Sequence, residues 1–303
     1  MTLENRSRLH RSIVYGLVVI GALAFARSSG APPTFSGAPG ELDCTICHSD
    51  YALNSGNGVP EIVAGPWYRP GQTLPFQVRF AANPGMRNGF EIAALTGGPG
   101  TYLYGFAPVD NTTQSMGNPT PNQYLTHTFD GHMLSSWQAT FTVPNPAPRA
   151  FTFYAAFNQA NGDQWLTGDY IHTRSRTLTI LPLIASGTPQ PGQTVSLQLD
   201  VASDAGFAYQ MGTSLGNSGI PIGGGRVIPL SPDLVLSLSL SGALPTVFQN
   251  YAGLLDAQGQ ATAALALPGV LELAGIQLHN AFVTASGAGI ATISNDEPFT
   301  IVP

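Results

Sequence analysis

The sequence predicts an all-β protein made of two tandem antiparallel β-sandwich domains. Several runs alternate apolar and polar residues with the period of a half-buried strand. The 303 residues include 35 glycines and 25 prolines, which suit many short strands joined by turns. In no window do apolar residues recur at helical spacing between capping residues.

The first 26 residues are predicted to be a secretory signal peptide. Three arginines precede an apolar run from Ile13 to Ala26, whose last residues are small enough for cleavage. The run is shorter than the roughly 20 apolar residues that a membrane-spanning helix needs. We therefore expect an exported protein, periplasmic, on the outer surface or extracellular, without a lasting membrane span. An uncleaved N-terminal anchor is the alternative.

Residues 27–66 form a lead rich in Gly, Pro and Ser, which is predicted to be extended and to carry the cysteine motif discussed below. A first sandwich is expected over residues 67–181. Runs at 149–157 and 168–180 are rich in aromatic and β-branched residues, as strands are. The apolar residues that share one face in its two clearest strands are Leu74, Phe76, Val78 and Phe80, and Trp137, Ala139, Phe141 and Val143.

The second sandwich is expected over residues 182–303. A Pro-Gly-Gln-Thr turn feeds an alternating run twice, from Pro70 and again from Pro191, 121 residues later (191 − 70). That interval is about the length of one β-sandwich domain. The repeated turn therefore favours two successive sandwiches.

The charge balance excludes several functions. The formal net charge is −6 and the chain contains no lysine. Nucleic-acid binding needs a basic surface, and Schiff-base chemistry needs a lysine. The sequence thus favours an electron carrier or a binding module over an enzyme.

The only two cysteines, Cys44 and Cys47, are followed directly by His48. This C-x-x-C-H pattern is that of covalent c-type haem attachment. The two thiols bind the two vinyl groups of the porphyrin, and the histidine becomes the proximal iron ligand. We expect one haem c, with Cys44 and Cys47 as thioethers and His48 on the iron.

Three other interpretations of the motif are less well supported. A structural zinc site needs about four N or S ligands. A thioredoxin-like pair belongs at a helix start in a βαβ unit, which this sequence does not predict. A disulfide across two intervening residues is strained and closes almost no loop.

The sixth iron ligand is predicted to be His127. Strand periodicity places Leu125, His127 and Phe129 on one apolar face, and a histidine directed inward needs a partner. A core histidine bonded to a backbone carbonyl is the alternative interpretation. Other candidates for the ligand are His132 and Met86. His172 shares its strand face with Arg174 and Arg176 and is expected to point to water.

The stretch from Ser36 to Ile180 resembles the bacterial choice-of-anchor V domain, a reeler-like secreted module. The matching motifs lie at Cys44–His48, Tyr124–Thr128, Trp137 and Asn161–Tyr170. The resemblance implies a reeler-like or immunoglobulin-like sandwich and adds support to His127 as the distal ligand. The second unit resembles β-rich C-terminal modules of secreted bacterial proteins.

Two functions from different classes follow. The first is an exported monohaem c-type cytochrome-like protein that transfers single electrons to or from a redox partner protein, with iron held by His48 and His127. The second is a non-enzymatic cell-surface or adhesion module with structural haem or none, whose partners would be the cell surface or further copies of the chain.

Overall fold

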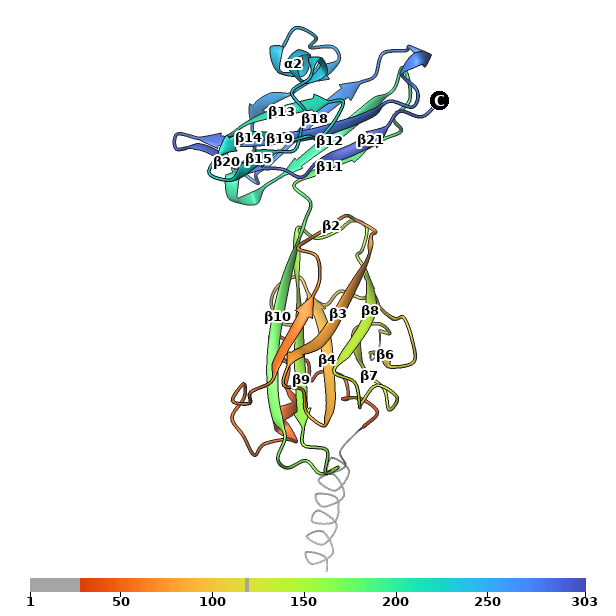
Figure 1. Ribbon diagram of the computed structural model, residues 1–303, viewed down its shortest axis with the longest axis vertical. Coiled ribbons are helices and arrows are strands. Elements are labelled where there is room, and N and C mark those ends of the chain that lie inside the picture. Colours follow the sequence, from red (N-terminus) through yellow and green to blue (C-terminus); the bar gives the residue numbers. More distant parts are fainter. Residues whose placement is uncertain (1–27, 118–119) are drawn as a thin grey trace, which may run out of the picture. The chain divides into compact units, whose positions relative to one another are not determined.

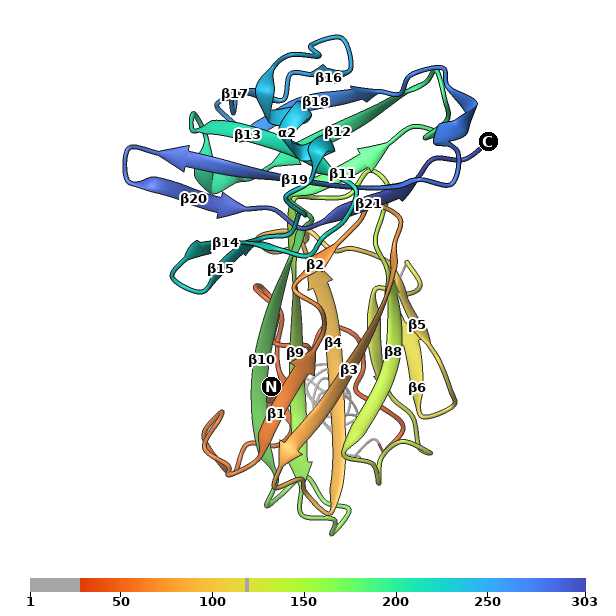
Figure 2. The same ribbon diagram turned by 45° about the horizontal axis from the view of Figure 1, so that its top comes forward.

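The computed structural model describes residues 28–117 and 120–303, and it divides the chain into two compact units, Met1–Ile180 and Leu181–Pro303. Both units are built from packed β-sheets (Figures 1 and 2), so the predicted all-β sandwich class is confirmed. The predicted signal peptide, residues 1–26, lies outside the described residues. Across the described part of the chain, no helix has both the length and the apolar character needed to cross a membrane.

Unit 1 consists of a four-stranded and a six-stranded sheet. Their strand orders are β1-β3-β8-β5 and β2-β10-β9-β4-β7-β6. The central pairs β3–β8, β9–β10 and β4–β9 are antiparallel. The strands are β1 Val59–Val63, β2 Trp67–Tyr68, β3 Thr73–Ala82, β4 Arg87–Leu95, β5 Phe106–Pro108, β6 Thr113–Met116, β7 Tyr124–His127, β8 Ser136–Thr142, β9 Ala150–Ala160 and β10 Tyr170–Ile180.

The core of unit 1 lies between these two sheets. The alternating residues predicted on β3 and β8 are all buried in it, together with phenylalanines of β9 and with Phe90, Ile92 and Ala94 of β4. The odd-numbered residues of β4 therefore face away from this core. That outer face is covered by the start of the described chain: Ala38 packs with Ala93 and Leu95, and Ala31 N donates to Thr126 Oγ1 at 3.2 Å.

One strand of unit 1 differs from the sequence prediction. Val59–Val63, expected to belong to the extended lead at 27–66, is strand β1 and pairs with β3. Pro60 sits at its second position, and proline within a short run argues against a central strand. β1 is an edge strand, where proline is tolerated.

The repeated Pro-Gly-Gln-Thr segments are β-turns. Gln72 N donates to Arg69 O at 3.2 Å in the first turn, and Gln193 N donates to Gln190 O at 3.0 Å in the second. Gly71 has φ +72° and Gly192 has φ +79°. A turn with proline second and a left-handed third residue is type II, which explains why glycine follows proline in both.

Unit 2 contains the sheets β11-β12-β18-β16 and β17-β13-β19-β20, with β21 also pairing β19, and the hairpin β14–β15. Their inner faces enclose a second core. The strands are β11 Leu183–Ser186, β12 Thr194–Asp200, β13 Ala208–Ser214, β14 Ile220–Gly223, β15 Arg226–Ile228, β16 Phe248–Gln249, β17 Ala252–Leu254, β18 Gln260–Ala266, β19 Gln277–Ser286, β20 Gly289–Ile293 and β21 Glu297–Thr300.

Unit 2 also contains a helix that the sequence did not predict, α2 Leu234–Ser241. Its sequence, LVLSLSLS, alternates leucine with other residues and so imitates a strand. The residues that indicate a helix here are the capping residues at its two ends, which the prediction did not use. Asp233 caps the N-terminus by accepting from Leu236 N at 2.9 Å, and Gly242 ends the helix at φ +68°.

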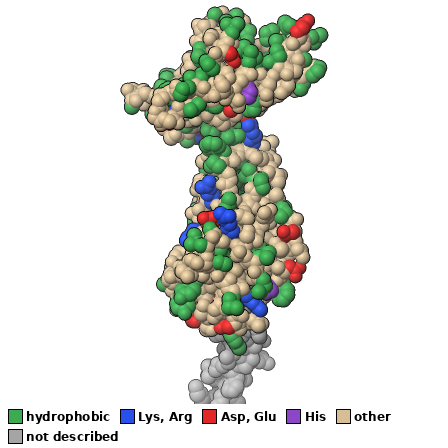
Figure 3. Space-filling model, in the orientation of Figure 1, with side chains coloured by type: hydrophobic (Ala, Val, Ile, Leu, Met, Phe, Trp, Pro, Cys, Tyr) green, Lys and Arg blue, Asp and Glu red, His purple; other side chains and the backbone are tan. Residues whose placement is uncertain are grey.

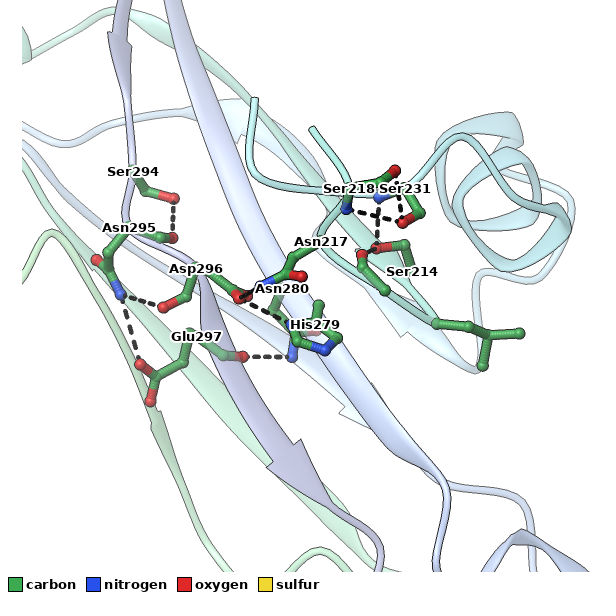
Figure 4. Close-up of polar contacts among 12 residues, drawn as sticks. Ser214, Asn217, Ser218, Ser231, His279, Asn280, Ser294, Asn295, Asp296 and Glu297 are labelled. Atoms are coloured by element: carbon green, nitrogen blue, oxygen red, sulfur yellow. Dashed lines mark hydrogen bonds and ion pairs between the residues drawn. The ribbon is translucent and has the colours of Figure 1, made fainter. Parts of the chain in front are cut away.

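A group of polar side chains fixes the loops of unit 2 (Figure 4). Asp296 Oδ2 lies 2.8 Å from His279 Nδ1 and accepts from Asn217 Nδ2 at 3.0 Å. Ser214, the register partner of His279, donates its hydroxyl to Gly216 O at 2.6 Å. Since Asp296 precedes β21 and Asn217 follows β13, this group joins three segments of the unit.

Candidate functional site

The Cys-x-x-Cys-His motif folds as a single helical turn. A 3₁₀-helix spans Cys44–Ile46, capped by Asp43, whose Oδ1 accepts from Thr45 N at 2.8 Å. Both Cys47 N (3.3 Å) and His48 N (3.0 Å) donate to Cys44 O. Residues three positions apart lie on the same side of a 3₁₀ turn, and His48 follows directly after Cys47. The turn therefore presents both thiols, which are free, and the imidazole together.

The imidazole of His48 is oriented by the end of β9 and the start of β10. Its Nδ1 lies 2.8 Å from Oδ2 of the buried Asp169, as an ion-pair contact without hydrogen-bond geometry. Its Nε2 lies 3.4 Å from Nδ2 of Asn158. Metal-binding histidines commonly have one ring nitrogen oriented by a carboxylate, which leaves the other for the metal. For His48 that other nitrogen is Nε2.

The motif lines a pocket of unit 1. Its cavity has a volume of about 160 Å³ and is open to solvent. That is less than the roughly 300–1,000 Å³ of sites that enclose a drug-sized ligand, so a large group bound here would extend beyond the cavity. The walls are mainly apolar, and the residues that bear titratable or metal-binding groups are Cys44, Cys47, His48, Arg87, His127, His132 and Asp169.

His127, at the end of β7, lines the same pocket and is only 7% exposed. Its Nδ1 accepts from Phe90 N at 3.2 Å and lies 3.4 Å from Phe90 O, so that Phe90 can serve either tautomer of the ring. Its Nε2 has no hydrogen-bond partner among the described residues. Burial lowers the pKa of His127 to about 4, so the ring is neutral at pH 7, the form that binds metals.

The two imidazoles approach the six-stranded sheet at the same place. The ring of His127 packs on Gly89, where an added Cβ would lie 2.5 Å from Cε1 and 3.0 Å from Nε2. The ring of His48 contacts Asn158, and Gly89 and Asn158 are register partners on β4 and β9. Partner residues on adjacent strands lie about 5 Å apart. The glycine thus makes room for the His127 ring next to the strand that His48 contacts.

Two buried polar atoms of the pocket lack hydrogen bonds within the described chain: His48 Nδ1 and Asn158 Oδ1. Buried polar groups are nearly always satisfied, and exceptions call for a missing partner or a functional role. Two free thiols and two imidazoles at an apolar pocket are the groups that would attach c-type haem and bind its iron. The residues present therefore fit such a group.

The other candidate ligands are placed differently. His132 lines the pocket, and its Nδ1 contacts Phe129 O. Met86 is 75% exposed and does not line the pocket. Phe129, predicted to share the inward face of His127, is 63% exposed, because β7 ends at His127 and a turn follows.

The prediction for His172 was wrong. It is only 1% exposed, not directed to water, and its Nε2 lies 3.1 Å from Gln159 Oε1. Phe80 of β3 covers the ring edge-on at 6.2 Å. The opposite sheet therefore reaches this end of β10, whereas Arg174 further along the strand stays exposed. His172 does not line the pocket.

Two carboxyl groups lie behind the motif, on the outer face of β4. Glu41 accepts from Tyr102 Oη and Tyr124 Oη, both at 2.5 Å, through one oxygen. Glu91 accepts from Phe35 N at 2.8 Å, but its buried Oε2 has no partner in the described chain. Burial raises the pKa of Glu91 to about 8.

Burial, Glu91 and Asp43 together raise the pKa of the Cys44 thiol above its usual range. A redox-active or zinc-binding cysteine needs a stabilised thiolate. Cys44 lies in the opposite environment, with acidic neighbours that oppose ionisation. The local electrostatics therefore disfavour the thioredoxin-like and zinc interpretations of the motif.

Sequence reasoning missed Asn158, Asp169, Arg87, Gly89 and Glu91. The segment from 158 to 169 was predicted to be a turn-rich connection between strands, and it does join β9 to β10. No local pattern marks these five residues: the register of β4 against β9 places four of them, and Asp169 lies just before β10.

No family model matches the chain, and no curated protein matches it. Two crystal structures of the human F-spondin reeler domain align with it at a TM-score of 0.34 and 14% identity, covering 45% of this chain and 97% and 98% of those chains. A marsupial T cell receptor aligns at a TM-score of 0.25 and 12% identity, covering 81% of this chain and 73% of that chain. The resemblance to the choice-of-anchor V domain stays a prediction.

Proposed function

We propose that this chain is an exported monohaem c-type cytochrome-like protein that transfers single electrons. Cys44 and Cys47 would hold the haem as thioethers, and His48 would be the proximal ligand. The observation that carries the proposal is that one pocket is lined by both thiols, His48 and His127, with a glycine where the second imidazole packs. Bound haem supplies a one-electron iron couple.

The side chains around the motif would act on the iron ligands and on solvent access. Asp169 would orient His48 so that Nε2 is left for the iron, as carboxylates behind metal-bound histidines do. Phe90 holds the ring of His127 through Nδ1. The apolar walls from Pro32, Phe35 and Leu166 would limit the contact of a bound group with water, which lowers the local dielectric and so affects the potential.

Two protein ligands on the iron favour electron transfer over binding of a small molecule. If His48 and His127 both held the iron, no site for a small molecule would be left there, and the iron would supply a one-electron couple. We therefore propose a carrier whose partner is another redox protein. The test is a redox titration of the purified haem protein, in which a reversible one-electron couple and a low-spin spectrum in both states are expected.

Replacing His127 with alanine is expected to convert the ferric spectrum from low-spin to high-spin, because the sixth position loses its imidazole. Absorption and electron paramagnetic resonance spectra measure this change. His132→Ala is the matched control, since His132 lines the same pocket, and it should leave the spectrum low-spin. If only the His132 variant becomes high-spin, the two assignments must be exchanged; if neither does, both histidines are excluded as ligands.

A further inference from the structure

The pocket has one arginine whose role the iron ligands do not explain. Arg87 is the only Arg or Lys among its described lining residues. No carboxylate of residues 28–117 or 120–303 forms an ion pair with it, and no hydrogen bond of its guanidinium is found there. The chain has no lysine, and seven of its eleven arginines lie beyond residue 28. Cationic side chains are therefore few in this part of the chain, and one of them lines a mainly apolar pocket.

Other arginines of unit 1 are placed differently. Arg79 is paired with Glu61 at 2.9 Å on the outside of β3, and Arg174 bonds Asn54 Oδ1 at 3.2 Å. Together with Arg176 they line a shallow surface groove, and Figure 3 shows blue side chains gathered on this unit. Arg79 and Arg174 each have a protein partner at the surface, whereas Arg87 faces the pocket.

The sheet fixes where Arg87 lies relative to the two imidazoles. It begins β4 and pairs with Ala160, while Gly89 and Asn158 form the pair beneath the histidines. Alternation along β4 puts Arg87 and Gly89 on the same outer face, about 7 Å apart along the strand at roughly 3.4 Å per residue. Arg87 is therefore displaced from the ligand position toward the loop from Asn161 to Asp169, which forms the rim of the pocket.

The substituents of a haem indicate which of its groups an arginine at position 87 would contact. When two thiols have reacted with the vinyl groups, the ring still carries two propionate carboxylates, on the side of the ring away from the vinyl groups. A guanidinium binds a carboxylate through two parallel hydrogen bonds and stays charged at every working pH. We propose that Arg87 binds a haem propionate; this inference rests on the proposed function.

The charge of Arg87 then acts on the iron as well as on the carboxylate. Neutralising a nearby negative charge disfavours the more positive ferric state. Arg87 is thus a positioning residue that also raises the reduction potential. It would keep the propionate ionised, so that the potential changes little with pH in the weakly acidic range.

The experiment compares the wild-type haem protein with Arg87→Gln, Arg87→Lys and the control Arg174→Gln. At a fixed ambient potential, Arg87→Gln is expected to raise the ratio of ferric to ferrous haem roughly tenfold, the effect of one charge about 10 Å away at intermediate dielectric. It should also introduce a pH dependence near the propionate pKa. Arg87→Lys keeps the charge and should stay within about twofold to threefold of wild type.

Arg174→Gln removes an equal charge from the surface and should leave both the ratio and the pH profile as in wild type. If Arg87→Gln behaves like this control while carrying haem, Arg87 does not bind a propionate. Absence of haem from the wild-type protein would instead overturn the proposed function, and this inference with it. The potential distinguishes the proposed role from a purely structural one, because a loss of folding would lower haem content without shifting the couple of the haem retained.

Discussion

A chain in which Cys44 and Cys47 are both replaced by alanine is expected to retain no haem after denaturation. Each thioether is a covalent bond, whereas the ligand bonds from His48 and His127 are lost when the chain unfolds. The measurement is haem-dependent peroxidase staining of a denaturing gel, on protein matured with the haem-attachment machinery. The effect is complete loss of the stained band, the largest predicted for any substitution in this chain.

The single variants give the control for this result. Cys44→Ala and Cys47→Ala each leave one thiol beside His48 and should retain a reduced amount of covalent haem. Their turn should survive, because its hydrogen bonds to Cys44 O come from the backbone. Covalent haem that persists in the double variant would contradict the assignment, since the chain has no other cysteine.

Glu91→Gln is expected to change how the stability of unit 1 depends on pH. The folded pKa of Glu91 is raised by burial to about 8, from 4.5. Between these values the unfolded chain has released this proton and the folded chain has kept it, so stability falls as pH rises. The slope from this group is about 1.4 kcal/mol per pH unit. Below pH 4.5 the contribution is fully present, and above about pH 8 it is lost.

The amide introduced by Glu91→Gln cannot ionise, so the difference in unfolding free energy between this variant and wild type should grow with pH by about 4 kcal/mol from pH 5 to pH 8. All three tryptophans, Trp67, Trp137 and Trp165, belong to unit 1, so urea unfolding followed by tryptophan fluorescence reports on this unit. Parallel stability curves for the two proteins would show that Glu91 is ionised in the folded state.

Glu41→Gln is the matched control on the neighbouring carboxyl group. Glu41 accepts hydrogen bonds from two tyrosines and from Ser36, and an amide would replace one acceptor oxygen with a donor. We expect it to destabilise unit 1 by about 2 kcal/mol. The two substitutions are expected to affect stability differently because Glu41 has partners for both oxygens, whereas Glu91 Oε2 has none in the described chain.

The strands of the two cores could be predicted because their residues alternate with period two, as in the run from Leu74 to Phe80. Where a local feature imitated another structure, the prediction failed. Strand β1 was not predicted because it contains Pro60, and helix α2 was not predicted because its leucines alternate as in a strand. In β1, pairing at a sheet edge determined the structure in spite of the proline. In α2, capping at the two ends determined it in spite of the strand-like apolar pattern.

The candidate site was predictable in part. The spacing of Cys44, Cys47 and His48 is a property of consecutive residues, so the sequence carries it. That His127 is buried could be predicted from its apolar neighbour Leu125, but not that its ring packs on Gly89, on the outer face of β4. The positions of Asn158, Asp169 and Arg87 depend on register between strands some seventy residues apart, which no local pattern encodes. The burial of His172 likewise depends on which residues of the opposite sheet reach it.

The most direct test of haem attachment is a pyridine haemochrome assay of the wild-type chain, matured with the haem-attachment machinery and extracted with acidified solvent to remove unattached haem. We predict one haem per chain that resists extraction, with the spectrum of a porphyrin whose two vinyl groups are both saturated. A chain that is folded but contains no haem, or haem that is fully extracted, would contradict covalent attachment at Cys44 and Cys47.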